Sequence, residues 1–588
     1  MNHTPLSYRV EPFDPSGHRL LITLSIAHPD PAGQIVSLPA WIPGSYLIRD
    51  FSRHIESVTM KRDNRSVTWR KIDNHSWQAM PGDGALEISY VVYAWDLSVR
   101  GAHVDDTHAF FNGTSVFLRV HGQEQLPCDV TLVAPPNKSD WKVYTSLPRA
   151  TGAGAAREHG FGRYVAPDYD ALLDHPVEMG RPQSIVFTAH GAKHELVFTG
   201  LSHDLDLARI AADVQKICEV QIAFFEPRTR RAPFLDSAQK YVFMTQLTPD
   251  GYGGLEHRAS TALMAARRDL PLKGQAGLTE GYKTFLGLVS HEYFHTWHVK
   301  RIKPAVFAPY DLTQPNLTRL LWVFEGFTSY YDDLFLLRAG IIDETAYLQL
   351  LGKSINQVAR GPGRHKQSLS DSSFDAWTRY YKQDENSPNA IVSYYTKGAL
   401  AALGLDLTIR RATQDRYALD DVMLLLWQRF GRDFYKGAQQ GVPEDAMPAL
   451  ILEATGVDVS RQIKQWVDGT ADVPLAELLT EHGIHLSWQA NSRAPTLDIR
   501  TRKLGDSLIV ANVIEHGAGH RGGLSAGDTL VAIEGLRVSA ATTLDDVLSR
   551  FRPNTTVGIH VFRNDELHAL RVRLRPAPPS DCVLTPFK

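Results

Sequence analysis

The sequence has few cysteines, no long apolar run and no basic tract, and each absence excludes a class of protein. Its three cysteines, Cys128, Cys218 and Cys582, lie far apart without a CxxC pair, which argues against a disulfide framework and a thiolate metal site. No stretch of about 18 apolar residues occurs, and the N-terminus lacks a basic start followed by an apolar run. We therefore expect a cytoplasmic protein with no membrane partner.

Length and charge limit the number of domains and the kind of partner. At 588 residues, with 43% hydrophobic and 22% charged residues, the chain has the composition of a globular protein and is long enough for two to four domains. The formal net charge is −3, and no Lys/Arg cluster stands out. Nothing in the sequence therefore indicates a nucleic-acid partner.

The most informative segment is His291-Glu292-Tyr293-Phe294-His295. On a helix, positions i and i+4 share a face, so both imidazoles can reach one metal ion while Glu292 points beside it toward a water molecule. Residues 282–300 contain no Pro, and their apolar positions are spaced for one buried face. This spacing predicts a helix over 282–300, which Pro304 ends. The pattern predicts a zinc site and hydrolytic chemistry.

A zinc site of this kind needs a third protein ligand and one open position. Glu325 is the candidate, because in a second apolar, helix-compatible run at 319–340 it is a lone carboxylate among Trp322, Phe324 and Phe327. Burying it unpaired would be costly, and metal ligation would offset that cost. The alternative is that Glu325 lies at a helix edge and faces water. His298 lies on a different azimuth from His291 and His295, so we expect it to be a packing or hydrogen-bonding neighbour.

These motifs resemble a known group of enzymes. HExxH followed at a distance by the Glu of W-x-x-E-G-F resembles the gluzincin aminopeptidases. The longer string HEYFHTWHVKRIKP, with 29 residues between His295 and Glu325, is similar to the glycyl aminopeptidase family, metallopeptidases that usually carry a C-terminal PDZ domain. The resemblance implies that His291, His295 and Glu325 bind one zinc ion per chain and that Glu292 is the general base. His298 departs from it, because many relatives have Asn there.

Two further segments resemble parts of the same active site. Gly253-Gly254-Leu255-Glu256 is similar to the Gly-x-x-Glu element, an edge strand whose Glu binds the substrate's free α-amine, so Gly253, Gly254 and Glu256 are the expected substrate-binding residues. A carboxylate near the metal can pair with an ammonium and fix the scissile bond one residue away. The alternative is a simple Gly-Gly turn with a solvated Glu256.

The segment 393–398 is similar to the Tyr-x-Lys-Gly element, which implies that Tyr395 donates a hydrogen bond to the oxyanion of the tetrahedral intermediate. A buried structural role for Tyr395 is the alternative, with Tyr394 as the replacement. The element 41–51 also resembles part of the family. Its Tyr and Arg either reach the cleft or form a packed turn between strands.

The fold class follows from patterns along the chain. Residues 1–167 alternate in the manner of strands, which predicts an N-terminal β-sandwich. Residues 168–478 become mixed and then helical, including runs at 399–409 and 422–430, and the resemblance implies a thermolysin-like mixed sheet plus helical catalytic domain. Residues 479–588 resemble a PDZ domain and tail, with a helix at 543–551 and a carboxylate loop near 504–507. The expected class is multidomain α+β.

The resemblance covers essentially the whole chain, so the preferred hypothesis is a zinc-dependent aminopeptidase acting on peptides with a free N-terminus. The resemblance implies a preference for small N-terminal residues, Gly or Ala. One alternative is an endopeptidase with the same zinc chemistry, and another is a noncatalytic adaptor whose PDZ domain recruits chain ends. The PDZ domain either binds a peptide or protein C-terminus or serves as a structural module.

Overall fold

The computed structural model describes residues 4–437, 439–490 and 494–587. Two compact units make up the chain. The first comprises Met1–Asn316, Leu334–Ile341 and Leu426–Pro443, and the second comprises Leu317–Asp333, Ile342–Leu425 and Glu444–Lys588. Among the described residues, every helix is too short or too polar to cross a membrane.

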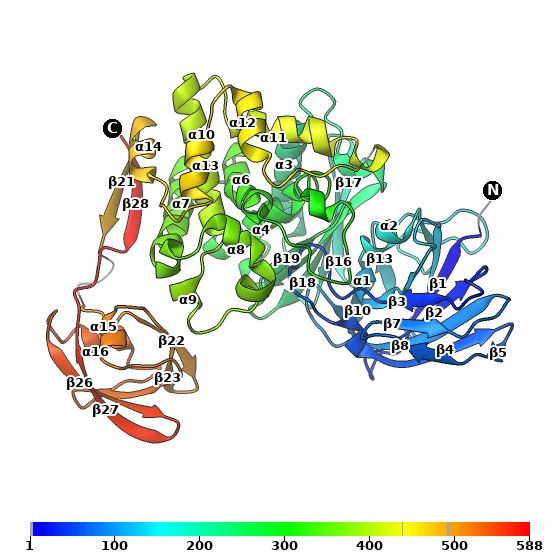
Figure 1. Ribbon diagram of the computed structural model, residues 1–588, viewed down its shortest axis with the longest axis horizontal. Coiled ribbons are helices and arrows are strands. Elements are labelled where there is room, and N and C mark those ends of the chain that lie inside the picture. Colours follow the sequence, from blue (N-terminus) through cyan, green and yellow to red (C-terminus); the bar gives the residue numbers. More distant parts are fainter. Residues whose placement is uncertain (1–3, 438, 491–493, 588) are drawn as a thin grey trace. The chain divides into compact units, whose positions relative to one another are not determined.

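Three β-sheets form the N-terminal part of the first unit (Figure 1, blue to cyan). Their strands are β1 (Leu6–Asp14), β2 (Arg19–Ile26), β3 (Ile35–Ser37), β4 (Ile55–Arg62), β5 (Arg65–Ser66), β6 (Trp69–Lys71), β7 (Ser76–Ala79), β8 (Leu86–Tyr93), β9 (Ala102–Val104), β10 (His108–Phe111), β11 (Arg119–Val120), β12 (Cys128–Leu132), β13 (Lys142–Tyr144), β14 (Gly162–Ala166) and β15 (Val177–Gly180). The orders are β14-β12-β1-β2-β8-β4-β5, β13-β15-β10-β9 and β11-β3-β7-β6. Two short helices, α1 (Gly113–Val116) and α2 (Tyr169–Leu173), lie between strands.

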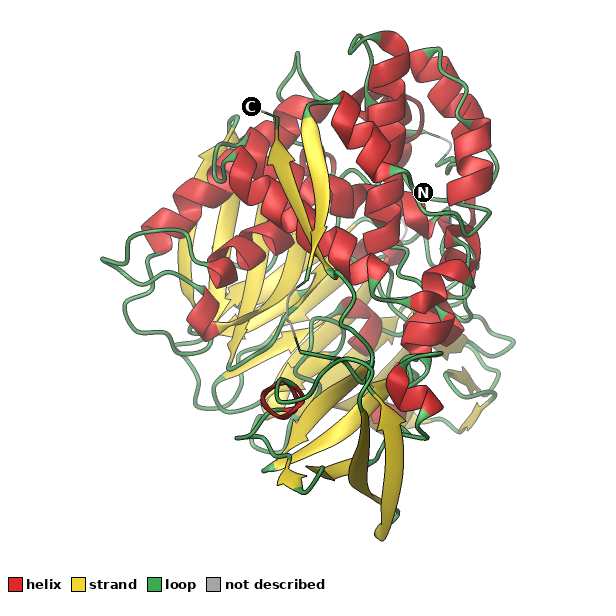
Figure 2. Cartoon of the chain, turned by 90° about the vertical axis from the view of Figure 1, so that its left-hand side faces the viewer, coloured by secondary structure: helices red, strands yellow, loops and turns green. Residues whose placement is uncertain are grey.

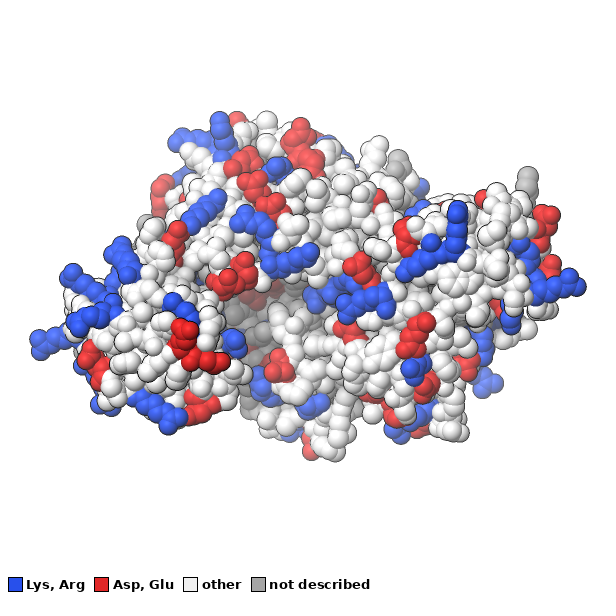
Figure 3. Space-filling model, turned by 60° about the horizontal axis from the view of Figure 1, so that its bottom comes forward, with Lys and Arg blue, Asp and Glu red and all other residues white. Residues whose placement is uncertain are grey.

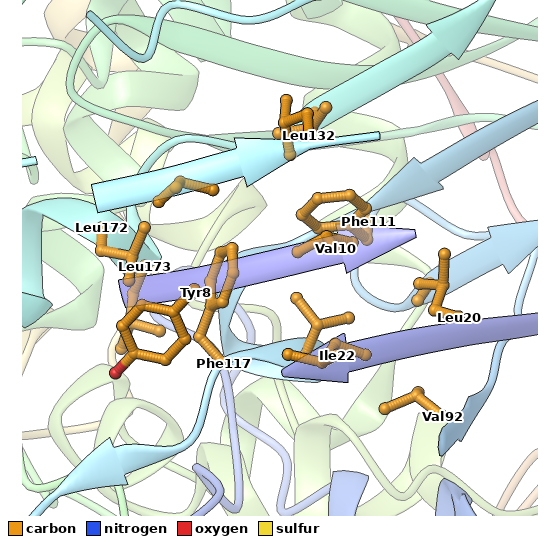
Figure 4. Packing of buried hydrophobic residues seen from close by; sticks show 14 of the residues in the cluster. Tyr8, Val10, Leu20, Ile22, Val92, Phe111, Phe117, Leu132, Leu172 and Leu173 are labelled. Carbon is orange, nitrogen blue, oxygen red and sulfur yellow. The ribbon is translucent and has the colours of Figure 1, made fainter. Parts of the chain in front are cut away.

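Alternation along the strands explains how these sheets share one core. In β2 and β8, every second side chain is buried, as expected for strands with one face against a core and one toward solvent. Figure 4 shows Tyr8, Val10 and Ile22 packed with Phe111 and Phe117, which come from other segments. Tyr8 completes the packing by donating a 2.7 Å hydrogen bond from its hydroxyl to the carbonyl of Leu118.

A five-stranded mixed sheet follows in the same unit. Its order is β16-β17-β18-β20-β19, from β16 (Gln183–Ala189), β17 (Ala192–Thr199), β18 (Lys240–Thr248), β19 (Gly253–Glu256) and β20 (Ser260–Ala266). The three inner strands are parallel, and both outer strands run antiparallel to their neighbours. Helix α3 (Leu207–Phe225) packs on β16 and on α4 (Glu280–Phe294). In Figure 2 helices are red and strands yellow.

The second unit is helical up to residue 481. Its helices are α5 (Leu321–Phe324), α6 (Gly326–Arg338), α7 (Glu344–Ala359), α8 (Leu369–Phe374), α9 (Ser387–Ala390), α10 (Thr396–Thr413), α11 (Leu419–Leu426), α12 (Met447–Thr455), α13 (Ser460–Trp466) and α14 (Leu475–Glu481), of which α6 and α11 extend into residues of the first unit. Gly326 and Gly398 meet where α6 and α10 begin, and a Cβ on either glycine would collide with the other backbone.

The C-terminal part of the second unit is a small β domain. Its sheet has the order β22-β23-β24-β26-β27, with β25 paired to β24. The elements are β21 (Ile484–Gln489), β22 (Ile499–Leu504), β23 (Ser507–Val513), α15 (Ala518–Arg521), β24 (Thr529–Ile533), β25 (Leu536–Arg537), α16 (Leu544–Leu548), β26 (Thr556–Arg563), β27 (Glu566–Arg573) and β28 (Asp581–Pro586). The predicted fold class, with its β-sandwich, mixed sheet plus helices, and PDZ domain, is confirmed.

Several predicted elements are shorter than expected. The helix predicted over 282–300 ends at Phe294, the run at 422–430 passes from α11 into a π-helical turn at Trp427–Gly431, and the helix predicted at 543–551 is only α16. The loop at 504–507 is not an open carboxylate loop, because Gly505 and Asp506 form the tight turn of the β22–β23 hairpin. Local apolar spacing predicts that a helix exists better than where it ends.

Candidate metal centre

Helix α4 carries both histidines of the HExxH motif. It starts with Thr279, whose side-chain oxygen accepts a hydrogen bond from the backbone N–H of Tyr282, and its apolar face is buried. The backbone of His295 remains in the right-handed helical region after the last α-helical residue. The Nε2 atoms of His291 and His295 therefore lie 3.1 Å apart, with the two rings nearly perpendicular.

The end of α4 fixes the tautomer of His295. The chain turns after Phe294, which brings the carbonyl of His298 within 2.6 Å of His295 Nδ1. A carbonyl only accepts hydrogen bonds, so Nδ1 carries the proton and Nε2 keeps its lone pair on the side of His291. The early helix end therefore prepares His295 to bind a metal.

Glu325 lies at the junction between α5 and α6 and is 2% exposed. The alternative in which this carboxylate faces water is therefore wrong. His291, His295 and Glu325 form a group whose ligand atoms lie within 4.8 Å of one another. Two imidazoles and a carboxylate are the donor types expected of a zinc site.

Glu292 and Glu256 lie beside the histidines. Ligand atoms of Glu256, Glu292 and His295 also lie within 4.8 Å of one another, and both glutamates are buried. Strand β19 reaches Glu292 at Gly254, where a Cβ would collide with the Glu292 carboxylate. Glycine at position 254 therefore lets the strand approach the helix without displacing the Glu292 carboxylate. Glu256 is 4% exposed, so the solvated-turn alternative is wrong.

Strand β19 is the last strand of its sheet and, within the described residues, pairs only with β20. Gly253 and Gly254 are partly exposed on it, whereas Leu255 and Glu256 are buried. An extended peptide can add to such an edge through main-chain hydrogen bonds. Gly44, from the predicted element at 41–51, lies against the Glu256 carboxylate with a φ of +91°.

Tyr394 and Tyr395 precede helix α10. Tyr394 is fully buried, whereas Tyr395 is partly exposed, and their rings stack with centroids 4.7 Å apart. Burial, followed by the charges of Tyr381 and Glu325, raises the pKa of the Tyr394 hydroxyl well above its usual value, so it stays protonated. Backbone atoms of Tyr394 also lie against Gly326, next to Glu325.

Comparison with known proteins connects this geometry to a family. Residues 7–181 match the model of the peptidase M61 N-terminal domain, residues 284–401 match that of the M61 glycyl aminopeptidase, and residues 495–574 match that of a PDZ domain. The chain belongs to the M61 glycyl aminopeptidase family.

One solved structure agrees with this assignment over nearly the whole chain. A protein from Idiomarina loihiensis, described as an aminopeptidase N family protein, is 40% identical, with a TM-score of 0.93 over 99% of this chain and 98% of its own. A variant M1 zinc metallopeptidase from Deinococcus radiodurans, bound to a Tyr-Ser-Ala substrate, is 15% identical, with a TM-score of 0.48 over 80% of this chain and 94% of its own. A search of curated proteins gave no match.

Sequence reasoning missed Asp174, which supports the Glu256 end of β19 in this M61 family member. Its carboxylate accepts hydrogen bonds from His257 Nδ1 and Lys300 Nζ, each at 2.9 Å, and from the backbone N–H of Arg258 at 3.2 Å. Burial alone would raise the pKa of Asp174, but Lys300, His257 and Arg258 outweigh it and hold the pKa well below its usual range. No motif in the sequence marks Asp174.

Proposed function

We propose that the chain is a zinc-dependent aminopeptidase that hydrolyses the N-terminal peptide bond of peptides. The observation that carries this proposal is the gathering of Glu256, Glu292 and His295 within 4.8 Å. One carboxylate binds the free α-amine while the other serves as the base, so the bond cut is the one next to the amine. An endopeptidase has no need of an amine-binding carboxylate at this place.

His291, His295 and Glu325 would hold one zinc ion per chain. The residues fit this ion, because the 3.1 Å separation of the two Nε2 atoms suits two ligands of one cation and the tautomer of His295 is set by the His298 carbonyl. When bound, zinc acidifies a water molecule and polarises the scissile carbonyl.

Glu292 accepts a proton from the attacking water and passes it to the departing amine, because an amide anion is a poor leaving group. Tyr395 donates a hydrogen bond to the oxyanion of the tetrahedral intermediate. Tyr395 is partly exposed, whereas Tyr394 is fully buried, so Tyr395 is the one of the two that a substrate can contact. No protein nucleophile takes part.

The edge strand β19 would align the peptide, with Gly253 and Gly254 offering main-chain groups and Glu256 holding the amine. A preference for Gly or Ala at the N-terminus belongs to the proposal by family membership. The Gly44 backbone lies against the Glu256 carboxylate and thereby limits the room beside the amine. The PDZ domain would bind a peptide or protein C-terminus, and a cytoplasmic location remains a prediction.

Paired substrates test the reaction type. A peptide with a free N-terminus and its N-acetylated form are incubated with the zinc-loaded chain, and cleavage is followed by mass spectrometry. We expect only the free peptide to be cut, at its first bond. Equal cleavage of both would replace the aminopeptidase with an endopeptidase.

The metal is tested separately. Glu325→Ala should lower both zinc affinity and turnover, because the ion loses one of its three protein ligands. Zinc content is measured by elemental analysis after dialysis. If Glu325→Ala binds zinc with unchanged affinity, another residue is the third ligand. If the zinc-loaded wild-type chain hydrolyses no peptide, the noncatalytic adaptor is favoured.

A further inference from the structure

A second cluster of metal-binding side chains lies in the N-terminal sheets. Strands β9 and β10 form a hairpin in which Phe110 pairs with His103 and the backbone N–H of Asp105 donates to the carbonyl of His108. Side chains at i and i+2 share a face, and cross-strand partners share it too. The hairpin register therefore places His103, Asp105 and His108 on one face.

The side chains converge as the register requires. Ligand atoms of His103, Asp105 and His108 all lie within 4.8 Å of one another, and His103 Nε2 is 3.2 Å from Asp105 Oδ2. The 3.2 Å distance between His103 Nε2 and Asp105 Oδ2 suits two ligands of one cation as well as a direct hydrogen bond. Two imidazoles and one carboxylate are donors that zinc and related divalent transition metals accept.

The hairpin turn holds Asp105 in place. Its Oδ1 atom accepts hydrogen bonds from the backbone N–H of Thr107 at 2.7 Å, the Thr107 hydroxyl at 2.6 Å and the backbone N–H of His108 at 3.1 Å. The Oδ2 atom is directed to His103. One carboxylate oxygen thus organises the turn while the other faces the imidazoles.

Glu178 orients the other histidine. It comes from β15, which pairs with β10, and its Oε1 atom lies 3.1 Å from His108 Nδ1. A carboxylate on one ring nitrogen of a histidine leaves the other nitrogen for a metal, which is the usual support for a metal-binding imidazole. Trp95 stacks on the His103 ring with centroids 4.7 Å apart and so restricts its rotation.

The charges of the cluster favour a cation. His103, His108 and Glu178 are each less than 5% exposed. Within the described part of the chain, neither Asp105 nor Glu178 forms an ion pair with Lys or Arg. A buried carboxylate and a partly exposed carboxylate that face two buried imidazoles are stabilised by a positive charge.

We propose that His103, Asp105 and His108 bind one divalent transition-metal ion, with zinc as the probe, at a site separate from the His291 and His295 centre. The ion would join β9, the hairpin turn and β10, and Glu178 would orient His108. The site would stabilise the N-terminal sheets, because an ion that binds only the folded chain raises its stability.

The test uses the full chain with His291→Ala and His295→Ala, which removes two ligands of the proposed catalytic site. After chelator treatment and dialysis against zinc, elemental analysis should find one ion per chain. In this background zinc should also raise Tm. Adding Asp105→Asn, which keeps the amide oxygen for the turn, or His108→Gln should lower zinc affinity by about tenfold or more, or 1.4 kcal/mol.

Asp106→Asn is the matched control, because Asp106 is in the same turn, its side chain is 60% exposed and its loss of charge is the same. It should leave the affinity unchanged. A background chain that binds no zinc, or one whose binding is equal with Asp105→Asn and with Asp106→Asn, would overturn the proposal. In the otherwise unaltered chain, the expected content is two ions, falling to one with Asp105→Asn. The count of two ions includes the ion of the proposed function. The readouts with His291→Ala and His295→Ala depend neither on peptidase activity nor on zinc at that centre, so they are independent of the proposed function.

Discussion

At the scale of single residues, the buried carboxylates of Glu292 and Glu256 repel each other when both are ionised. Both are buried, and their carboxylates lie within 4.8 Å of each other and of His295. Two like charges at this separation disfavour each other's ionised form unless a cation lies nearby. A metal ion beside Glu292 and a substrate ammonium at Glu256 would each supply positive charge. The site is therefore arranged for a cationic group at both ends.

Glu292→Gln separates the chemistry from metal binding. The amide keeps the size of the side chain but cannot accept the water proton, so we expect kcat to fall by about 10²–10⁴-fold or more. Zinc content, measured by elemental analysis, should not change, because Glu292 is not among the proposed ligands. Full activity in this variant would contradict the assigned base.

Tyr395→Phe tests the oxyanion donor. Removal of one hydroxyl that acts in the transition state should lower kcat by about 10²-fold or more with a smaller change in KM. Tyr394→Phe is the matched comparison, because Tyr394 is adjacent and buried. A larger loss of kcat in Tyr394→Phe than in Tyr395→Phe would transfer the role to Tyr394.

Lys303 gives a pH-dependent prediction. Its ammonium is buried over the rings of Tyr310, Phe434 and Tyr435, and burial, followed by the charge of Lys300, lowers its pKa to about 7. In the unfolded chain the pKa of Lys303 is about 10.4. Below pH 7 Lys303 is charged in both states, so the buried charge lowers the stability of the folded chain in full. Between pH 7 and about 10 only the folded chain loses the proton, so this loss of stability declines as the pH rises.

Lys303→Met should therefore raise the free energy of unfolding at pH 6. The gain should shrink by up to about 1.4 kcal/mol per pH unit above pH 7, since one pKa unit corresponds to that energy. Urea unfolding of both proteins between pH 6 and pH 10 measures the difference. A gain that stays constant over this range would show that Lys303 is not a buried cation.

At the scale of elements, α4 shows what sequence patterns can and cannot predict. Apolar spacing correctly predicted a helix under the HExxH motif, because one buried face requires it. The end of the helix was predicted too far along the chain, because Pro304 was taken to mark it. In the structure, the chain makes a tight turn after Phe294, in which the backbone N–H groups of Thr296 and Trp297 donate to the carbonyls of Tyr293 and Phe294, each at 3.0 Å. Arg301 Nη1 holds this turn from further along the chain by donating to the Thr296 carbonyl at 2.7 Å. Neither the turn nor this contact is marked by Pro or Gly in the sequence.

Asp174 joins two elements, the end of β19 and the segment after α4. Asp174→Asn removes the charge that faces Lys300 and places an amide near the backbone N–H of Arg258, so the stability should fall by about 3–5 kcal/mol, as when a buried ion pair is broken. Because Glu256 adjoins this contact, KM for free-amine peptides should rise more than kcat falls.

Asp170→Asn is the control for this change. Asp170 contacts the same Arg258, but its side chain is 62% exposed, so the effect should be small. Thermal unfolding and steady-state kinetics of both variants give the comparison. Equal stability and equal KM in the two variants would reduce Asp174 to a packing residue.

At the scale of the molecule, the domain classes could be predicted because each stretch has its own local pattern. Strand alternation, the HExxH helix and the PDZ-like segment each satisfy a local rule. The approach of Glu256 to Glu292 could not be derived from spacing, because it depends on strand β19 passing α4 at Gly254. The family resemblance supplied that expectation. The boundaries at residues 167 and 478 remain predictions.

The molecule has a formal net charge of only −3, and charged residues of both signs are spread over its surface. On the face shown in Figure 3, Lys and Arg are interspersed with Asp and Glu. The hairpin turn of the proposed second metal site follows the same pattern, because Asp106 forms an ion pair with Lys138 at 3.5 Å beside the Asp105 carboxylate. Clusters of this kind are found by geometry rather than by net charge.

The segments before and after the PDZ match pair with each other in a two-stranded sheet. Strands β21 and β28 pair antiparallel, and β28 packs on α7. Asn356 of α7 donates from Nδ2 to Asp581 Oδ1 at 2.9 Å and accepts at Oδ1 from the backbone N–H of Cys582 at 2.6 Å. One amide thus satisfies two polar groups of β28.

Asn356→Ala should lower the free energy of unfolding by about 1–3 kcal/mol, because the buried backbone N–H of Cys582 loses its acceptor. Limited proteolysis should also cut within 575–587 sooner than in the unaltered chain. Gln357→Ala is the matched control, because Gln357 is the next residue of α7 and is exposed. If Asn356→Ala unfolds and is cleaved like Gln357→Ala, then strand pairing and apolar packing alone hold the two-stranded sheet, and Asn356 contributes nothing to its attachment.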